Sequence, residues 1–125
     1  MWGKSLHINL YNCECHDDIF IEPETWNIEE RARQLFSDFT QELLKEIKMK
    51  AYGYPTLQWF GEEKAEGYTW VQLLETSNLI LHTSQYNSIY CDLFSCKDYN
   101  PDKVIELCHK YFKPTKLSFD MLIRK

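Results

Sequence analysis

The stretch GYTWVQLLETSNLILHT, residues 67–83, gives the clearest indication of the fold. It contains nearly all of two apolar, β-prone runs, residues 68–74 and 78–84. The short polar break between these runs is typical of a tight turn or bulge that joins two strands. A third run of the same kind, residues 88–95, follows closely. The middle of the chain therefore predicts three consecutive strands of an antiparallel sheet.

A strand and a helix precede this centre. Residues 5–11 alternate apolar and polar side chains, which is the pattern of a half-buried strand. Apolar residues at steps of three and four over residues 32–47 predict an amphipathic helix. Asn27, with Glu30 three residues later, is the expected N-cap of that helix. Residues 51–60 are aromatic and β-prone, and they predict one more strand before the centre.

A second helix and a last strand follow the centre. Asn100 precedes Pro101, and proline is favoured at the first position of a helix because its missing N–H is not needed there. Residues 104–112 carry an apolar stripe, and Pro114 ends the helix. Residues 116–123 predict the final strand. The predicted order is β-α-β-β-β-β-α-β.

Length and composition agree with one compact domain over residues 1–125. An antiparallel sheet with two helices on one face is an α+β two-layer sandwich. Fourteen Lys and Arg against 19 Asp and Glu give a net charge of −5, which argues against nucleic-acid binding. No apolar run approaches the roughly 18 residues of a membrane span, and no signal peptide is recognisable. We therefore expect a cytoplasmic protein without a membrane or nucleic-acid partner.

The cysteines predict neither disulfides nor a metal site. They are Cys13, Cys15, Cys91, Cys96 and Cys108. Their number is odd and no export signal accompanies them, so a disulfide framework is not expected. The cluster of Cys13, Cys15 and His16 lacks the second ligand pair that a closed zinc site needs. We expect buried or half-buried thiols and no metal.

The central stretch also carries the residues that suggest a chemistry. Without further context, Ser77 is a turn serine, His82 a strand histidine and Cys96 a strand-end thiol. However, this stretch, together with LHINLYNC at residues 6–13 and DLFSC at residues 92–96, resembles the prokaryotic S-adenosylmethionine decarboxylase proenzymes. That family is a group of small pyruvoyl-dependent enzymes, and the resemblance extends over most of the chain.

The resemblance implies a set of site residues. Ser77 matches the self-cleaving serine, whose hydroxyl would attack the carbonyl of Thr76 and split the chain between these two residues. His82 and Thr69 match the residues that assist this processing by moving protons. Cys96 matches the cysteine that returns a proton to the substrate carbon after CO₂ has left.

The resemblance also implies a cofactor, a substrate and a partner. Processing would convert Ser77 into a pyruvoyl group at a new N-terminus, which serves as electron sink in place of pyridoxal phosphate. The implied enzyme is a zymogen that matures by autocatalytic cleavage, a lyase that decarboxylates S-adenosylmethionine for spermidine synthesis. Members of the family form homodimers with the site between subunits. An adenine ring would need an aromatic platform, for which Trp59 and Phe60 are candidates.

The chain departs from the family pattern around this site. Thr76 stands where the family has glutamate, and Asn78 where it has histidine. Ser84, Gln85 and Tyr86 replace a Trp-Pro-Glu segment. These departures leave two alternatives open. One is the same pyruvoyl chemistry on another amino acid, such as arginine or ornithine, and the other is a non-processing homologue that acts as a binding or regulatory protein.

Overall fold

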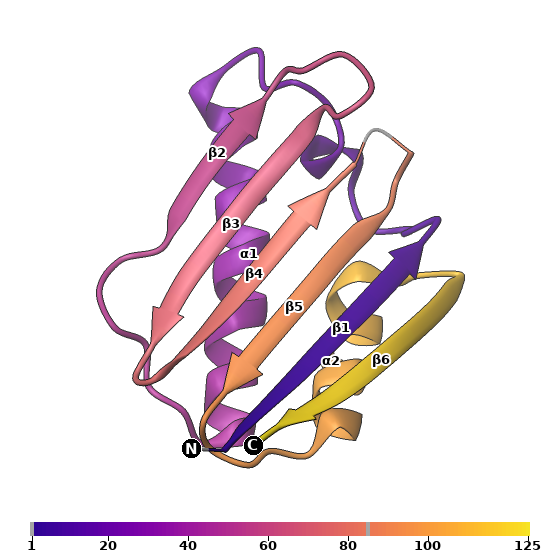
Figure 1. Ribbon diagram of the computed structural model, residues 1–125. Helices are drawn as coiled ribbons and strands as arrows, with labels where there is room; N and C mark the ends of the chain where they lie inside the picture. Colours follow the sequence, from indigo (N-terminus) through magenta and orange to yellow (C-terminus); the bar gives the residue numbers. More distant parts are fainter. Residues whose placement is uncertain (1, 85) are drawn as a thin grey trace.

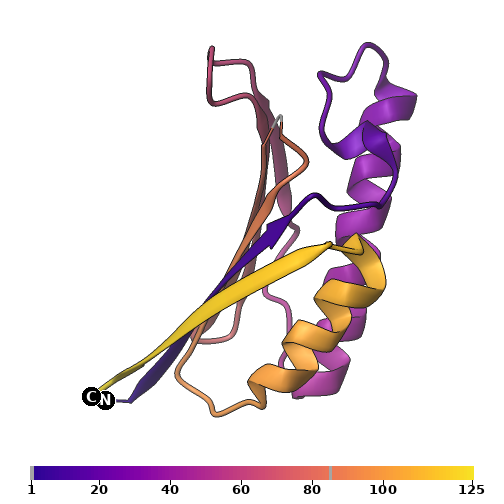
Figure 2. The ribbon, with the colours of Figure 1, turned by 90° about the vertical axis from the view of Figure 1, so that its right-hand side faces the viewer.

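The computed structural model describes residues 2–84 and 86–125. Within these residues, six strands form one antiparallel sheet and two α-helices lie together on one of its faces (Figures 1 and 2). The predicted α+β two-layer sandwich and the predicted element order are thus confirmed. The elements are β1 (Gly3–Tyr11), a 3₁₀ turn (Asp17–Ile19), α1 (Trp26–Ile47), β2 (Thr56–Phe60), β3 (Gly67–Leu74), β4 (Ser77–Thr83), β5 (Ile89–Ser95), α2 (Pro101–Phe112) and β6 (Lys116–Arg124).

The sheet has the strand order β2-β3-β4-β5-β1-β6, so β1 is inserted between β5 and β6. The meander from β2 to β5 follows the chain, as the sequence predicts. Leu74 pairs with Ser77, and Glu75 and Thr76 are therefore the two turn residues between β3 and β4. The break in the central stretch is a tight turn, and Ser77 is the first residue of β4.

Aromatic side chains hold the helices against the inner face of the sheet. Phe36 of α1 packs on Tyr68 and Trp70 of β3, with ring centroids 6.3 and 5.8 Å apart. It also contacts Phe112 of α2, which joins the two helices over the same core. The indole N–H of Trp70 donates to Thr40 Oγ1 at 3.1 Å, so the one polar atom of this buried side chain is satisfied. β3 is therefore fixed firmly to the helices.

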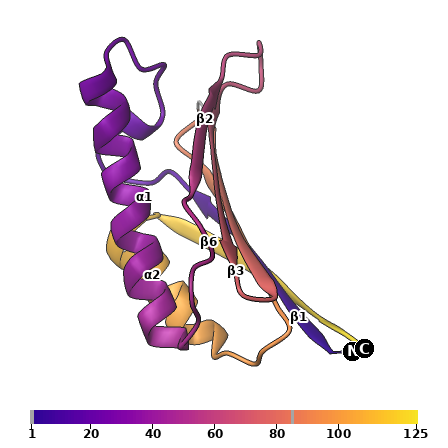
Figure 3. The same ribbon diagram turned by 90° about the vertical axis from the view of Figure 1, so that its left-hand side faces the viewer.

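The opposite, outer face of the sheet is not covered by any described helix (Figures 2 and 3). Side chains alternate between the two faces along each strand. In β4, the residues from Ser77 to Thr83 alternate between buried and half-buried. Ser77 is consequently directed towards the helices, whereas His82 is directed towards the outer face.

Two local expectations are wrong. Thr25 caps α1 in place of Asn27, because Thr25 has an extended backbone and its Oγ1 accepts the Ile28 N–H at 3.4 Å. Asn27 lies inside the first turn. The strand predicted over residues 51–60 is also shorter than expected, since β2 begins only after Pro55, a residue without an N–H for the strand ladder.

Candidate functional site

The turn between β3 and β4 places a strained residue directly before Ser77. Thr76 has φ 59°, in the left-handed region that β-branched residues rarely adopt. Such a conformation stores strain on the order of 1–3 kcal/mol. The Thr76 hydroxyl donates to the carbonyl oxygen of Glu75 at 2.6 Å. A strained turn residue therefore directly precedes Ser77.

The Ser77 side chain is held by a second buried hydroxyl. Ser77 lies directly opposite Ser95 in the β4–β5 ladder, and its Oγ donates to Ser95 Oγ at 2.8 Å. Ser95 is completely buried, and its Oγ also accepts the backbone N–H of Lys97 at 2.9 Å. Ser77 itself is only 9% exposed. The candidate nucleophile is thus a hydrogen-bonded hydroxyl with little exposure to solvent.

Cys96 follows Ser95 at the end of β5, so the chain brings it next to the turn. It is half-buried. A cavity of about 230 Å³ opens here, and Thr76 and Ser95 are among its lining residues. The ammonium group of Lys97 donates to the backbone carbonyl of Lys48 at 2.7 Å and so ties this segment to the end of α1. Ser77, Ser95 and Cys96 form what we call the turn end of the hairpin.

The segment after Cys96 is anchored to β1. Lys4 Nζ lies 3.0 Å from Asp98 Oδ1 and donates to the Tyr99 carbonyl at 2.8 Å. Its hydrogen bond and positive charge lower the pKa of the Asp98 carboxyl. The Tyr99 hydroxyl donates to the Leu93 carbonyl at 3.1 Å, and burial raises the pKa of this phenol. The backbone that carries Cys96 is therefore fixed on both sides.

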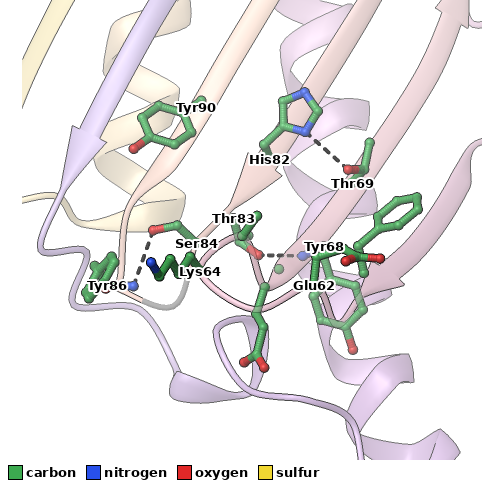
Figure 4. A pocket seen from close by; sticks show the side chains of 13 residues that line it. Glu62, Lys64, Tyr68, Thr69, His82, Thr83, Ser84, Tyr86 and Tyr90 are labelled. Carbon is green, nitrogen blue, oxygen red and sulfur yellow. Dashed lines mark hydrogen bonds between the residues drawn. The ribbon is translucent and has the colours of Figure 1, made fainter.

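Thr69 and His82 meet at the other end of the same hairpin. They are opposite each other in the β3–β4 ladder, and a hydrogen bond of 3.1 Å joins Thr69 Oγ1 to His82 Nδ1. Figure 4 shows both side chains on the outer face, with Tyr90 of the neighbouring strand beyond His82. A hydroxyl and an imidazole in contact can exchange protons. We call this pair and the pocket beside it the open end of the hairpin.

A pocket of about 550 Å³ adjoins the Thr69–His82 pair. Its lining combines four aromatic residues, Phe60, Tyr68, Tyr86 and Tyr90, with charged and polar side chains. Of the two expected platform residues, Phe60 lines this pocket, whereas Trp59 packs edge-on against Tyr68 with ring centroids 5.0 Å apart. Burial raises the pKa of Tyr68 to about 12, so its hydroxyl keeps its proton at neutral pH. The pocket is large enough for a small-molecule ligand.

The structure thus unites the predicted site residues in two groups and separates the groups. Ser77 and His82 are five residues apart in one strand, about 16 Å along its axis. They also lie on opposite faces, because their spacing is odd. Strand periodicity alone contains this information. The contact between Ser95 and Ser77 could not be predicted from the sequence pattern, since it depends on the register between β4 and β5.

The cysteines lie as expected. Cys13, Cys91 and Cys108 are buried, Cys15 and Cys96 are half-buried, and all five are free thiols. Burial raises the pKa of the Cys15 thiol to about 11, which makes it a poor nucleophile at neutral pH. Within residues 2–84 and 86–125, no three Cys, His, Asp or Glu side chains gather as a metal site, and no helix is long and apolar enough to cross a membrane. Gln85, in the departing segment, lies outside the described residues.

Comparisons with known proteins agree with the fold. The sequence model of the S-adenosylmethionine decarboxylase family matches residues 5–125. Among solved structures, the adenosylmethionine decarboxylase from Aquifex aeolicus is similar, with a TM-score of 0.67 and 18% sequence identity over 96% of this chain and 88% of that chain. At this identity the likeness shows the fold. No curated protein sequence matches.

Proposed function

The chain belongs to the S-adenosylmethionine decarboxylase family, and from this premise we propose that it is a self-processing, pyruvoyl-dependent decarboxylase of S-adenosylmethionine in polyamine biosynthesis. One observation carries the proposal. The candidate nucleophile Ser77 directly follows Thr76, whose backbone is strained at φ 59°. A serine hydroxyl beside a strained peptide is what an acyl shift within the chain requires.

Processing follows from this arrangement by a balanced series of steps. Ser77 Oγ attacks the carbonyl carbon of Thr76, the C–N bond between the two residues breaks, and the proton lost by the hydroxyl reaches the amine. The strained peptide becomes an ester. β-Elimination then releases Thr76 as a carboxylate and leaves a dehydroalanine, which water converts into a pyruvoyl group and ammonia. The products are residues 1–76 and a blocked piece formed from residues 77–125.

A homodimer would reunite the two ends of the hairpin. In one chain, the Thr69–His82 pair lies about 16 Å from Ser77, too far to move its proton. A two-fold axis that packs two outer sheet faces together would set the open end of one copy over the backbone of the β3–β4 turn of the other, so that the imidazole would approach the Thr76–Ser77 peptide from the face opposite to the Ser77 hydroxyl. The uncovered outer face carries half-buried apolar side chains such as Val71 and Ile80, which suit such a contact. We infer that each site takes its serine from one copy and its imidazole from the second.

The open-end pocket supplies the binding surface in this proposal. Phe60, Tyr86 and Tyr90 are exposed and offer faces on which an adenine ring can stack and over which a sulfonium cation can lie. Glu62 and Glu66 outnumber Lys64 among the charged lining residues, and this negative balance favours a cationic substrate. The pyruvoyl group supplies an electron sink for loss of CO₂. Cys96, beside the turn, holds the proton that the product carbon needs.

Denaturing mass spectrometry of freshly purified protein tests the processing step. We expect two masses, for residues 1–76 and for a pyruvoyl-blocked piece formed from residues 77–125. The Ser77→Ala variant should give one uncut mass. A single mass from the unaltered chain after prolonged incubation would leave a non-processing homologue. Release of CO₂ from carboxyl-labelled S-adenosylmethionine, arginine or ornithine then identifies the substrate.

Mixing two inactive variants tests the shared site. The Ser77→Ala chain keeps His82, and a His82→Ala chain keeps Ser77. Each should stay uncut alone, while co-refolded chains should show cleavage of the His82→Ala chain only. If the mixture stays uncut although sedimentation detects mixed dimers, the residues do not work across two copies. Ser88→Ala in place of His82→Ala is the control that leaves both groups present.

A further inference from the structure

Ser95 has an environment that a packing residue would not need. Its side chain is completely buried, yet it carries a hydroxyl rather than a methyl group. A buried hydroxyl is costly unless it is hydrogen-bonded. Its oxygen accepts from two donors, the Ser77 hydroxyl at 2.8 Å and the Lys97 N–H at 2.9 Å. The buried hydroxyl is therefore satisfied as an acceptor, and one of its two donors is the candidate nucleophile.

The two bonds give Ser95 a defined orientation. The Lys97 donor is a backbone group, and Lys97 is fixed in turn by its ammonium contact with the Lys48 carbonyl. The antiparallel ladder places Ser95 directly across from Ser77. Ser95 Oγ thus has little freedom to move, and the Ser77 hydroxyl hydrogen is directed onto it. In contrast, the Thr69–His82 pair of the same chain is remote.

We propose that Ser95 is a positioning residue for self-processing, which holds the Ser77 oxygen at the strained Thr76 peptide for the first acyl shift. The inference rests on the proposed function, since it names the group that prepares the nucleophile for cleavage. Holding the hydroxyl hydrogen on Ser95 leaves a lone pair of Ser77 Oγ free to attack the Thr76 carbonyl carbon. Ser95 forms no bond to carbon in this step and is unchanged by it.

Cleavage rates of three Ser95 variants test the proposal. Ser95→Ala removes the acceptor and should slow chain cleavage roughly tenfold or more, the effect of losing one hydrogen bond to a reacting group. Ser95→Cys keeps nearly the same volume but offers only a weak acceptor, so it should also be slow. Ser95→Thr keeps the hydroxyl and should restore cleavage. Ser88→Ala, at a buried serine just before β5, should cleave at the unaltered rate.

Hydroxylamine separates positioning from a merely structural effect. It cleaves an accumulated ester, so it releases fragments from a chain that is blocked after the acyl shift. Ser95→Ala should release no additional fragments, because we place its defect before the ester forms. Circular dichroism checks the fold of each variant. If Ser95→Ala does not fold, the cleavage rate and hydroxylamine response of Ser95→Cys provide the test.

The outcomes are distinct. Unaltered protein that cleaves together with slow, folded Ser95→Ala and Ser95→Cys variants supports the proposal. Cleavage of both variants at the unaltered rate, or faster, overturns the role of Ser95 and leaves the proposed function standing. Fragments released from Ser95→Ala by hydroxylamine also overturn it, because the acyl shift would then not depend on Ser95. Unaltered protein that never cleaves overturns both.

Discussion

The two ends of the β3–β4 hairpin are built on opposite principles. The turn end consists of buried hydroxyls and a strained backbone beside a small cavity of about 230 Å³. The open end consists of half-buried polar side chains beside a larger pocket of about 550 Å³, lined by aromatic, charged and polar residues. The same two strands connect both ends. The comparison teaches that, in one chain, the group to be converted and the surface suited to a ligand are kept apart.

The largest expected effect lies at the open end. A Cβ on Gly67 would collide with the backbone carbonyl of Thr83, whose carbon would lie 2.8 Å away. Gly67→Ala should lower the free energy of unfolding by about 3 kcal/mol, because backbone cannot move aside as a side chain can. The measurement is urea denaturation in a Ser77→Ala background, where every chain is intact. Gly61→Ala, whose new atom would have only Trp59 Nε1 nearby at 3.6 Å, is the near-neutral control.

Relief of strain at the turn end should have a smaller effect of opposite sign. In the same uncut background, Thr76→Gly should raise the free energy of unfolding by about 1 kcal/mol, since glycine adopts φ 59° freely. Glu75→Gly, at a turn residue without positive φ, should instead lower it. With Ser77 present, Thr76→Gly should also cleave more slowly. An unaltered or lower stability would show that the turn stores no strain.

The Thr69–His82 hydrogen bond can be removed with little change in shape. Thr69→Val should cost about 1 kcal/mol of unfolding free energy or less, because the pair is only half-buried. Its cleavage rate should nevertheless fall at least about tenfold if this pair moves protons during processing. Thr56→Val, at an exposed position of β2, is the matched control for both measurements. Equal cleavage by both variants would confine the open end to binding.

The smallest effect concerns the anchor of Cys96 and depends on pH. Because Lys4 lowers the pKa of Asp98 in the folded chain, their ion pair stabilises the fold above the ordinary carboxyl pKa of about 3.9. This stabilisation is lost as the pH falls through the lowered value. Asp98→Asn should therefore reduce the melting temperature slightly near pH 7 and have no effect in strong acid. Glu22→Gln, at an exposed carboxyl, should show no such difference.

Most of the fold could be predicted from periodicity because burial dictates it. The apolar steps of α1 and the alternation in β1 place their residues correctly on the core. The helix start was missed because Thr25 and Asn27 are both good capping residues, and only the backbone conformation at Thr25 selects between them. Pro55 shortens β2 because proline has no N–H for the strand ladder, and the aromatic composition of residues 51–60 does not indicate this interruption.

The site was predictable as a set of residue types but not as a geometry. The odd spacing of Ser77 and His82 already implies opposite faces. The left-handed conformation of Thr76 has no signal in a Glu-Thr-Ser-Asn sequence, where asparagine would be the residue expected to adopt it. Ser95 could not be identified because strand register is a long-range property. The family pattern predicts neither the backbone conformation of Thr76 nor the contact of Ser95, since it gives residue types along the chain and not their neighbours in space.

The insertion of β1 between β5 and β6 has a consequence for a chain severed between Thr76 and Ser77. The first piece would own β1, β2 and β3, and the second would own β4, β5 and β6. Because β1 is flanked on both sides by strands of the second piece, strands of the two fragments would alternate within one sheet. Such a molecule is a split protein whose two fragments are joined by three strand pairings, β3–β4, β1–β5 and β1–β6, and by one core. Dilution would not part them, and separately expressed halves should reassemble only by folding together.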